Sequence, residues 1–301
     1  MPLNQTNEEV AQKAIDELAF KVRLESQFKR DLIRFFRRMS ADLRDTLANT
    51  GGSISAESYQ RELQRMLSVH YRRVERAFTS EITNFIRDNI NNVDELIIQD
   101  LQKIANARNK TIRQLLNDMR NNIKFDLQQF NNVNVAQDTI NITRTNQKEI
   151  DRAILKAENQ LKEEIGDMFS NTQLARLSSA NLTNANLSRV GTIAATTTQK
   201  IAEGTKQIER DNFLEVVNSV NARQAGVEPR QPEEIWVTQG DDLVRAGKGT
   251  PFNHRAADFT KKENGVFIVS NETLRFPGDS SLGASLGNII NCRCSAVTRI
   301  E

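Results

Sequence analysis

Three side chains near the C-terminus could bind a metal ion. Cys292 and Cys294 form a C-x-C pair, and His254 lies upstream of them. Two thiolates and an imidazole, completed by an aspartate or a water, would supply the four ligands that Zn²⁺ prefers. Two neighbouring cysteines without a second pair also occur as small core residues in a reducing cell. The sequence therefore leaves two hypotheses, a structural zinc site that helps a small module to fold and a packed apolar core.

The same cysteines do not predict a disulfide. On one face of a strand, residues two positions apart lie roughly 6.6 Å from each other with nearly parallel Cβ directions. That geometry is poor for an unstrained S–S bond, so we expect both thiols to be free.

Catalytic constellations are incomplete. His254 with Asp241, Asp242 or Asp258 would form only part of a metal nuclease, and Cys292 with His254 only the dyad of a thiol hydrolase. The sequence holds no glycine-rich phosphate loop. We therefore predict that the protein is not an enzyme and has no catalytic or cofactor-binding residues.

Composition indicates long helices with narrow apolar seams. The chain has 301 residues, of which 27% are charged and 6% aromatic, and its mean hydropathy is −0.55. These values are typical of a water-facing protein large enough for two domains. The net charge of +2 gives no field strong enough for tight nucleic-acid binding. No apolar stretch reaches the length of a bilayer span, and the first residues lack a signal pattern.

Apolar residues at helical spacing predict four helices in the first 170 residues. The stripes cover residues 32–47, 59–85, 97–123 and 150–168, with an end at Gly51-Gly52, an N-cap at Ser53 or Ser55, and an interruption near Arg108. The asparagine-rich residues 131–143 are expected to connect the third and fourth helices. Such narrow seams suit a coiled-coil-like bundle, completed either within the chain or by a partner.

Two features of this region favour plain structural interpretations. His70 lies on the apolar stripe of its helix, where a histidine is usually a packing residue. The A-N-L repeat in residues 180–187 has two copies, too few to stack a solenoid. Residues 190–224 again favour a helix, which ends before Pro229.

Turn and strand chemistry concentrates at the end of the chain. Four of the five prolines, seven of the thirteen glycines, the one tryptophan and both cysteines lie beyond residue 228. Residues 235–238, 266–269 and 296–300 are β-branched or aromatic runs bounded by turn residues, so they predict short strands, with a tight turn at Asn271-Glu272. The expected fold is mostly α, with a helical body (1–188), connecting helices (189–228) and a small α+β module (229–301).

The motifs of this module resemble, in order and spacing, those of the phage Mu F head-morphogenesis family. They are Trp236-x-Thr238-x-x-Asp241, Val244-Arg245, His254, a strand with Phe267, Phe276-Pro277-Gly278-Asp279 and Ile290-Asn291-Cys292-Arg293-Cys294. The resemblance covers residues 190–300. Leu243 stands where the family usually has a second arginine, and residues 247–251 separate Val244-Arg245 from His254. The family histidine is thus either displaced by an insertion or lost.

Physical roles can be assigned to the module's defining residues. Trp236 is expected to anchor the core, and Pro277-Gly278-Asp279 to form a turn. Arg245 and Arg293 could pair with Asp241, Asp258 or Asp279. The defining residues as a set are Trp236, Thr238, Asp241, Arg245, Pro277, Gly278, Asp279, Asn291 and Arg293.

The resemblance implies a role in the virion. Members of the family are low-copy proteins inside the phage head, associated with the portal and needed for head assembly or DNA delivery. We therefore expect a non-enzymatic minor head protein, made in the host cytoplasm and kept in the head interior. Its expected partners are the portal protein and the inner capsid surface, with packaged DNA and self-association through helices as further hypotheses and no membrane partner. The alternatives are a cytoplasmic coiled-coil adaptor and a virion protein ejected with the DNA.

Overall fold

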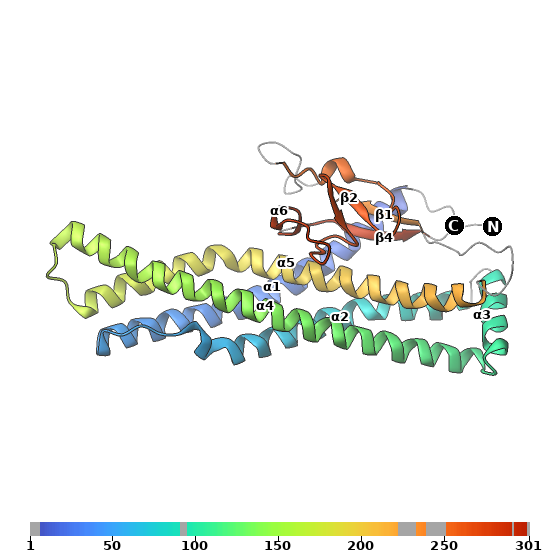
Figure 1. The fold of residues 1–301 in the computed structure, drawn as a ribbon, viewed down its shortest axis with the longest axis horizontal. Coiled ribbons are helices and arrows are strands. Elements are labelled where there is room, and N and C mark those ends of the chain that lie inside the picture. The colour runs from blue at the N-terminus through green and yellow to red at the C-terminus, as the bar shows by residue number, and fades with distance from the viewer. Residues whose placement is uncertain (1–6, 91–94, 222–232, 239–250, 291, 300–301) are drawn as a thin grey trace. The chain divides into compact units, whose positions relative to one another are not determined.

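Long helices make up most of the chain, and short strands follow them. The computed structural model describes residues 7–90, 95–221, 233–238, 251–290 and 292–299 (Figure 1). Its elements are α1 (Asn7–Thr50), η1 (Ala56–Tyr59), α2 (Gln60–Ile90), α3 (Glu95–Ala107), α4 (Ile112–Ile165), α5 (Asn171–Asn221), β1 (Glu233–Val237), η2 (Arg255–Ala257), β2 (Phe267–Val269), β3 (Glu272–Leu274), α6 (Leu286–Ile289) and β4 (Ser295–Arg299). The mostly helical fold with a small α+β module is confirmed. Among the described residues, no helix combines the length and apolar character needed to cross a membrane.

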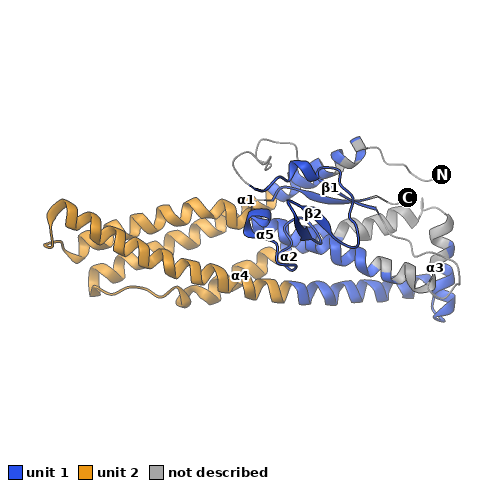
Figure 2. Ribbon diagram, turned by 45° about the horizontal axis from the view of Figure 1, so that its top comes forward, with its two compact units in different colours: residues 1–22, 73–130, 196–301 blue, residues 23–72, 131–195 orange. Residues whose placement is uncertain are grey.

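The chain divides into two compact units (Figure 2). Unit 1 holds residues 1–22, 73–130 and 196–301, and unit 2 holds residues 23–72 and 131–195. Each unit therefore collects segments that are far apart in the sequence. The expected boundary between residues 188 and 189 falls inside the continuous helix α5.

Unit 2 is a bundle of helical segments from α1, α2, α4 and α5. Its α1 segment buries Phe28, Leu32, Phe36, Met39, Leu43 and Leu47, which share one stripe because they are three or four residues apart. His70 is 1% exposed, and its ring stacks on Phe28 with centroids 4.1 Å apart, which confirms it as a packing residue. The Tyr71 hydroxyl donates to Asp138 at 2.6 Å, and Ser179 Oγ donates to the Ser40 carbonyl at 2.8 Å. These hydrogen bonds join α2 to α4 and α5 to α1 within the unit.

Several predicted helix ends agree with the structure. α1 ends at Thr50, and Gly51 adopts a φ of +67° as a C-terminal cap does. Of the two candidate caps, Ser55 accepts from the Glu57 N–H and begins η1. The interruption near Arg108 separates α3 from α4, with Asn109 at a φ of +50°.

The asparagine-rich connection was predicted wrongly, because residues 131–143 lie within α4. The buried side chains of Leu127, Asn131, Val135, Thr139 and Ile142 continue one stripe through the segment. The Thr139 hydroxyl donates to the Val135 carbonyl at 2.6 Å. The burial of a continuous face thus outweighs the low helix propensity of asparagine. The fourth predicted stripe, in contrast, is shorter than expected, since Ile165 and Met168 are 46% and 92% exposed.

The module is built on two antiparallel strand pairs. β1 pairs with β4, with Trp236 opposite Ala296, and β2 pairs with β3. The free edge of β1 receives a further segment, because the Phe259 and Lys262 N–H groups donate to the Trp236 and Glu234 carbonyls. The predicted strands are confirmed, except that Ile300 lies outside the described residues, and β3 is an addition. The tight turn lies one residue earlier than predicted, at Ser270-Asn271, where both φ values are positive, as in a type I′ hairpin turn.

Both faces of the β1–β4 ribbon are covered. Trp236 and Ala296 face one apolar cluster, together with Phe267, Val269, Leu274 and both cysteines. On the other face, Ile235, Val237 and Val297 pack with Ala14 of α1. The strand that carries Trp236 is thereby fixed from two sides within unit 1, and it provides the wall against which the cysteines and His254 lie.

Candidate metal centre

Loops position the three candidate ligands. His254 directly precedes η2, whose Ala257 N–H donates to the His254 carbonyl at 3.1 Å. Cys292 and Cys294 lie in the segment between α6 and β4, rather than on the strand itself. The Cys292 N–H donates to the Ile289 carbonyl at 3.3 Å, so the end of α6 holds the first cysteine. Strand β4 begins at Ser295, directly after Cys294.

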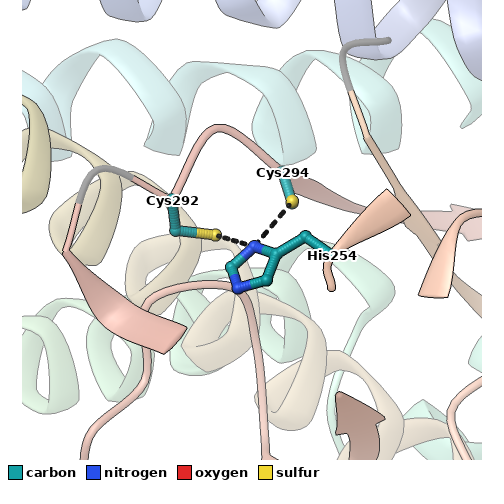
Figure 3. A group of neighbouring side chains, drawn as sticks. All are labelled: His254, Cys292 and Cys294. Carbon is teal, nitrogen blue, oxygen red and sulfur yellow. Dashed lines mark hydrogen bonds between the residues drawn. The ribbon is translucent and has the colours of Figure 1, made fainter. Parts of the chain in front are cut away.

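Both cysteine sulfurs lie close to one ring nitrogen of His254 (Figure 3). His254 Nδ1 lies 3.7 Å from Cys292 Sγ and 3.5 Å from Cys294 Sγ. All three candidate ligand atoms lie within 4.8 Å of one another. A nitrogen about 2.0 Å and a sulfur about 2.3 Å from a tetrahedral zinc ion are about 3.5 Å apart. The observed separations therefore fit a common metal ion as well as they fit thiol–imidazole hydrogen bonds.

The group is buried in the apolar core of the module. His254 is 2%, Cys292 3% and Cys294 0% exposed. The His254 ring meets Trp236 edge-on, with centroids 5.9 Å apart. Trp236 is itself fully buried, which confirms its role as core anchor.

The pKa values of the two thiols are shifted in opposite directions. A hydrogen bond from Cys294 holds the pKa of Cys292 well below its ordinary value, against the effect of burial. Burial raises the pKa of Cys294 well above its ordinary value, and the neighbouring Cys292 raises it more, while the Trp236 indole opposes the shift. One proton thus leaves this pair readily and the second reluctantly. A bound cation would favour the loss of both, because a metal-bound thiol is deprotonated.

No protein-family model, curated protein or solved structure matches the chain.

The predicted turn in the Phe276–Asp279 motif has the geometry that its residues favour. The Asp279 N–H donates to the Phe276 carbonyl at 3.0 Å, and Gly278 has a φ of +85°. Proline before a glycine of positive φ is typical of a type II turn. A Cβ on Gly278 would lie 3.3 Å from Gln199 Cγ of α5, so this turn also approaches the helix closely.

The predicted ion pairs take a different form. Asp279 pairs with Arg275, with 3.2 Å between Arg275 Nε and the carboxylate, and accepts from the Ser281 N–H and hydroxyl. Asp258 accepts from the backbone N–H of Thr238 at 2.7 Å. Asp279 thus acts on donors of its own turn, whereas Asp258 joins the end of β1 to the segment after η2. Asp241, Arg245 and Asn291 lie outside the described residues, and Arg293 is half-buried.

Two residues that sequence reasoning missed, Asn288 and Glu272, lie on the side of the His254 ring that faces away from the cysteines. Asn288 Oδ1 lies 3.1 Å from His254 Nε2, and Asn288 in turn contacts Glu272. Asn288 is not of a type that marks a zinc ligand, and the two residues come from α6 and β3. The pattern offered no signal for them, because β3 was not predicted.

The cysteine segment is also attached to α5. The Gln199 amide donates to the Cys294 carbonyl, and the Ala296 N–H donates to Glu203 at 3.0 Å. Lys21 of α1 donates to the Ser295 hydroxyl at 3.0 Å. The arrangement can hold a cation in a position fixed by surrounding elements. The three side chains are buried, as the ligands of a closed structural metal site are.

Proposed function

We propose that this chain is a non-catalytic phage minor head protein of the Mu F type, with a C-terminal module that is stabilised by zinc. The observation that carries the zinc proposal is the convergence of His254, Cys292 and Cys294 at separations that match zinc coordination. Zinc fits the donor set because two thiolates and an imidazole are its usual structural ligands. A small module gains much from such a link, since its own core is limited.

The zinc proposal is tested by metal analysis of the purified chain. Wild-type protein is expected to contain one zinc per chain and to melt at a lower temperature after chelation. Cys292→Ser and His254→Ala should lose the metal. His70→Phe is the matched control, because it removes the other histidine of the chain and keeps a ring against Phe28. Zinc-free wild-type protein that folds with unchanged stability in excess zinc would contradict the proposal.

The proposal of a head protein rests on the ordered motifs. Five motif residues from about 60 residues of sequence have side chains that meet around one buried cluster. They are Trp236, His254, Phe267, Cys292 and Cys294. This convergence supports their treatment as one functional module rather than as scattered matches. We place the protein inside the phage head, with the portal protein and inner capsid surface as partners.

Mass spectrometry of phage particles tests this role. The chain is expected at low copy number, relative to the major capsid protein, in purified full virions. Its retention in DNA-emptied particles would identify a portal-linked component, and its loss an ejected one. Absence from full virions, with the chain abundant in the infected cytoplasm, would instead support the coiled-coil adaptor.

A further inference from the structure

The amide group of Asn288 has a fixed orientation. Its Nδ2 donates to the Val269 carbonyl at 3.2 Å and to Glu272 Oε2 at 2.6 Å. A carbonyl and a carboxylate oxygen only accept, so the amide nitrogen must face both of them. Asn288 is fully buried, and rotation of its amide by 180° would place two acceptors against each other. The remaining atom, Oδ1, therefore faces His254 Nε2.

Glu272 is itself held in place from the opposite side. Its Oε2 accepts from the Ser285 N–H at 2.9 Å and from the Ser285 hydroxyl at 3.0 Å. These hydrogen bonds, with that from Asn288, keep the pKa of Glu272 below its ordinary value. The β2–β3 hairpin and the start of α6 thus meet at one carboxylate, which orients the asparagine.

The orientation of Asn288 decides which nitrogen of His254 carries the proton. An amide oxygen can only accept, so the 3.1 Å contact requires hydrogen on Nε2. In the neutral ring, Nδ1 then presents a lone pair, and this is the atom that faces both sulfurs. Metal-binding histidines commonly use an outer hydrogen bond of this kind to fix the ring and its tautomer.

We propose that Asn288, oriented by Glu272, is a positioning residue that holds His254 in the Nε2–H tautomer, with Nδ1 directed to a metal bound by Cys292 and Cys294. The assignment of Nδ1 as ligand rests on the zinc site proposed above. The tautomer itself does not, because it follows from hydrogen bonds made without a metal.

Imidazole NMR on the full-length, ¹⁵N-labelled chain tests the inference. The sequence contains two histidines, so the spectrum reduces to His70 and His254, and His70→Phe assigns them. In chelator-treated wild-type protein, His254 should carry its proton on Nε2. Asn288→Ala should give a mixture of tautomers. Asn253→Ala is the matched control, because Asn253 lies beside His254 and its side chain accepts from the Ala256 N–H.

Zinc affinity, measured by competition with a chromophoric chelator, provides the second readout. Loss of an outer hydrogen-bond partner typically weakens metal binding by about 10- to 100-fold. We expect this loss in Asn288→Ala, a smaller loss in Glu272→Gln, which retains an acceptor for the amide, and none in Asn253→Ala. A proton on Nδ1 in the wild-type chain, or an Asn288→Ala variant with unchanged tautomer and affinity, would overturn the inference. An Nε2–H tautomer in a chain that binds no zinc would support the positioning role and refute the metal site.

Discussion

Asn186 lies fully buried in unit 2, and neither its amide oxygen nor its amide nitrogen has a hydrogen-bond partner among the described residues. It belongs to the repeat at residues 180–187, but burial there follows the helix: Leu182 and Asn186, four residues apart, are both fully buried. A buried polar group without a partner costs folding free energy. A helical seam with such a residue gains specificity of register at the expense of stability.

We predict that Asn186→Leu stabilises the chain. Leucine has the same branching at Cγ, a higher helix propensity and no polar atoms to desolvate, so the free energy of unfolding should rise by about 1 to 2 kcal/mol. Thermal and urea unfolding followed by circular dichroism measure the change. Asn181→Leu is the control in the same helix. The Asn181 amide donates to the Ala153 carbonyl and to Gln160, so its replacement should not stabilise. A destabilised Asn186→Leu would show that the amide is satisfied.

Residue types revealed part of the candidate site in advance. The two thiols and the histidine could be selected because few side chains bind soft metals, and Trp236 because a single tryptophan in a small module is its natural core. Asn288 and Glu272 could not be selected, since their role depends on a hairpin and a four-residue helix that bring them behind His254. The pairing of Asp279 with Arg275 is local, whereas sequence reasoning sought longer-range partners.

At the scale of elements, the helical spacing of apolar residues predicted the helices more dependably than the local propensity of single residues did. The stripes of α1 and α2 and their ends near Gly51 and Ser55 followed from spacing and caps. The prediction that residues 131–143 form a connection was wrong because asparagine and threonine occupy seam positions of a helix of 54 residues. The three-residue strand β3 carries too little sequence for either signal.

Two glycines of α5 should respond in opposite directions to alanine. A Cβ on Gly191 would meet no atom within 4 Å, whereas a Cβ on Gly204 would overlap the ring of Phe130. Gly191→Ala is therefore expected to stabilise the helix by about 0.5 to 1 kcal/mol through reduced backbone entropy. Gly204→Ala should destabilise by about 1 to 3 kcal/mol, because the phenylalanine ring must move. Urea unfolding by circular dichroism compares the pair, and equal gains in both would refute the close approach at Gly204.

At the largest scale, unit 1 brings the beginning and the end of the chain together through buried charges. Glu203 of α5 pairs with Lys21 of α1 and, at 2.9 Å, with Lys206. Lys206 also pairs with Glu17 at 2.6 Å. The four charges cancel, and Glu203 and Lys21 further bind the backbone N–H of Ala296 and the hydroxyl of Ser295 in β4. The strand that follows the cysteines is thus attached to two helices by groups that are costly to leave unpaired.

The pH dependence of this network follows from its pKa shifts. Burial alone would raise the pKa of Glu203, but Lys206 and Lys21 hold it below its ordinary value. Its contribution is therefore present above the unfolded pKa of about 4.3 and is lost as the pH falls through the lower folded pKa. Burial alone would lower the pKa of Lys206, but Glu17 and Glu203 hold it above its ordinary value. Its contribution is present below about pH 10.4 and is lost as the pH rises through the higher folded pKa.

Glu203→Gln should therefore destabilise unit 1 at neutral pH and lose less stability than the wild-type chain on acidification. Removal of one partner leaves buried lysine charge uncompensated, at a cost of about 3 to 5 kcal/mol. Fluorescence of Trp236, the one tryptophan of the chain, follows unfolding of the module directly. Asp118→Asn provides the control within unit 1, because its ion pair with Lys110 is exposed, and such pairs contribute about 1 kcal/mol at most. If Glu203→Gln unfolds at the same urea concentration as the wild-type chain at pH 7, the charge network does not hold β4 on the helices, and other contacts, such as those of Ala14 with the ribbon and of Arg210 with Thr298, must do so.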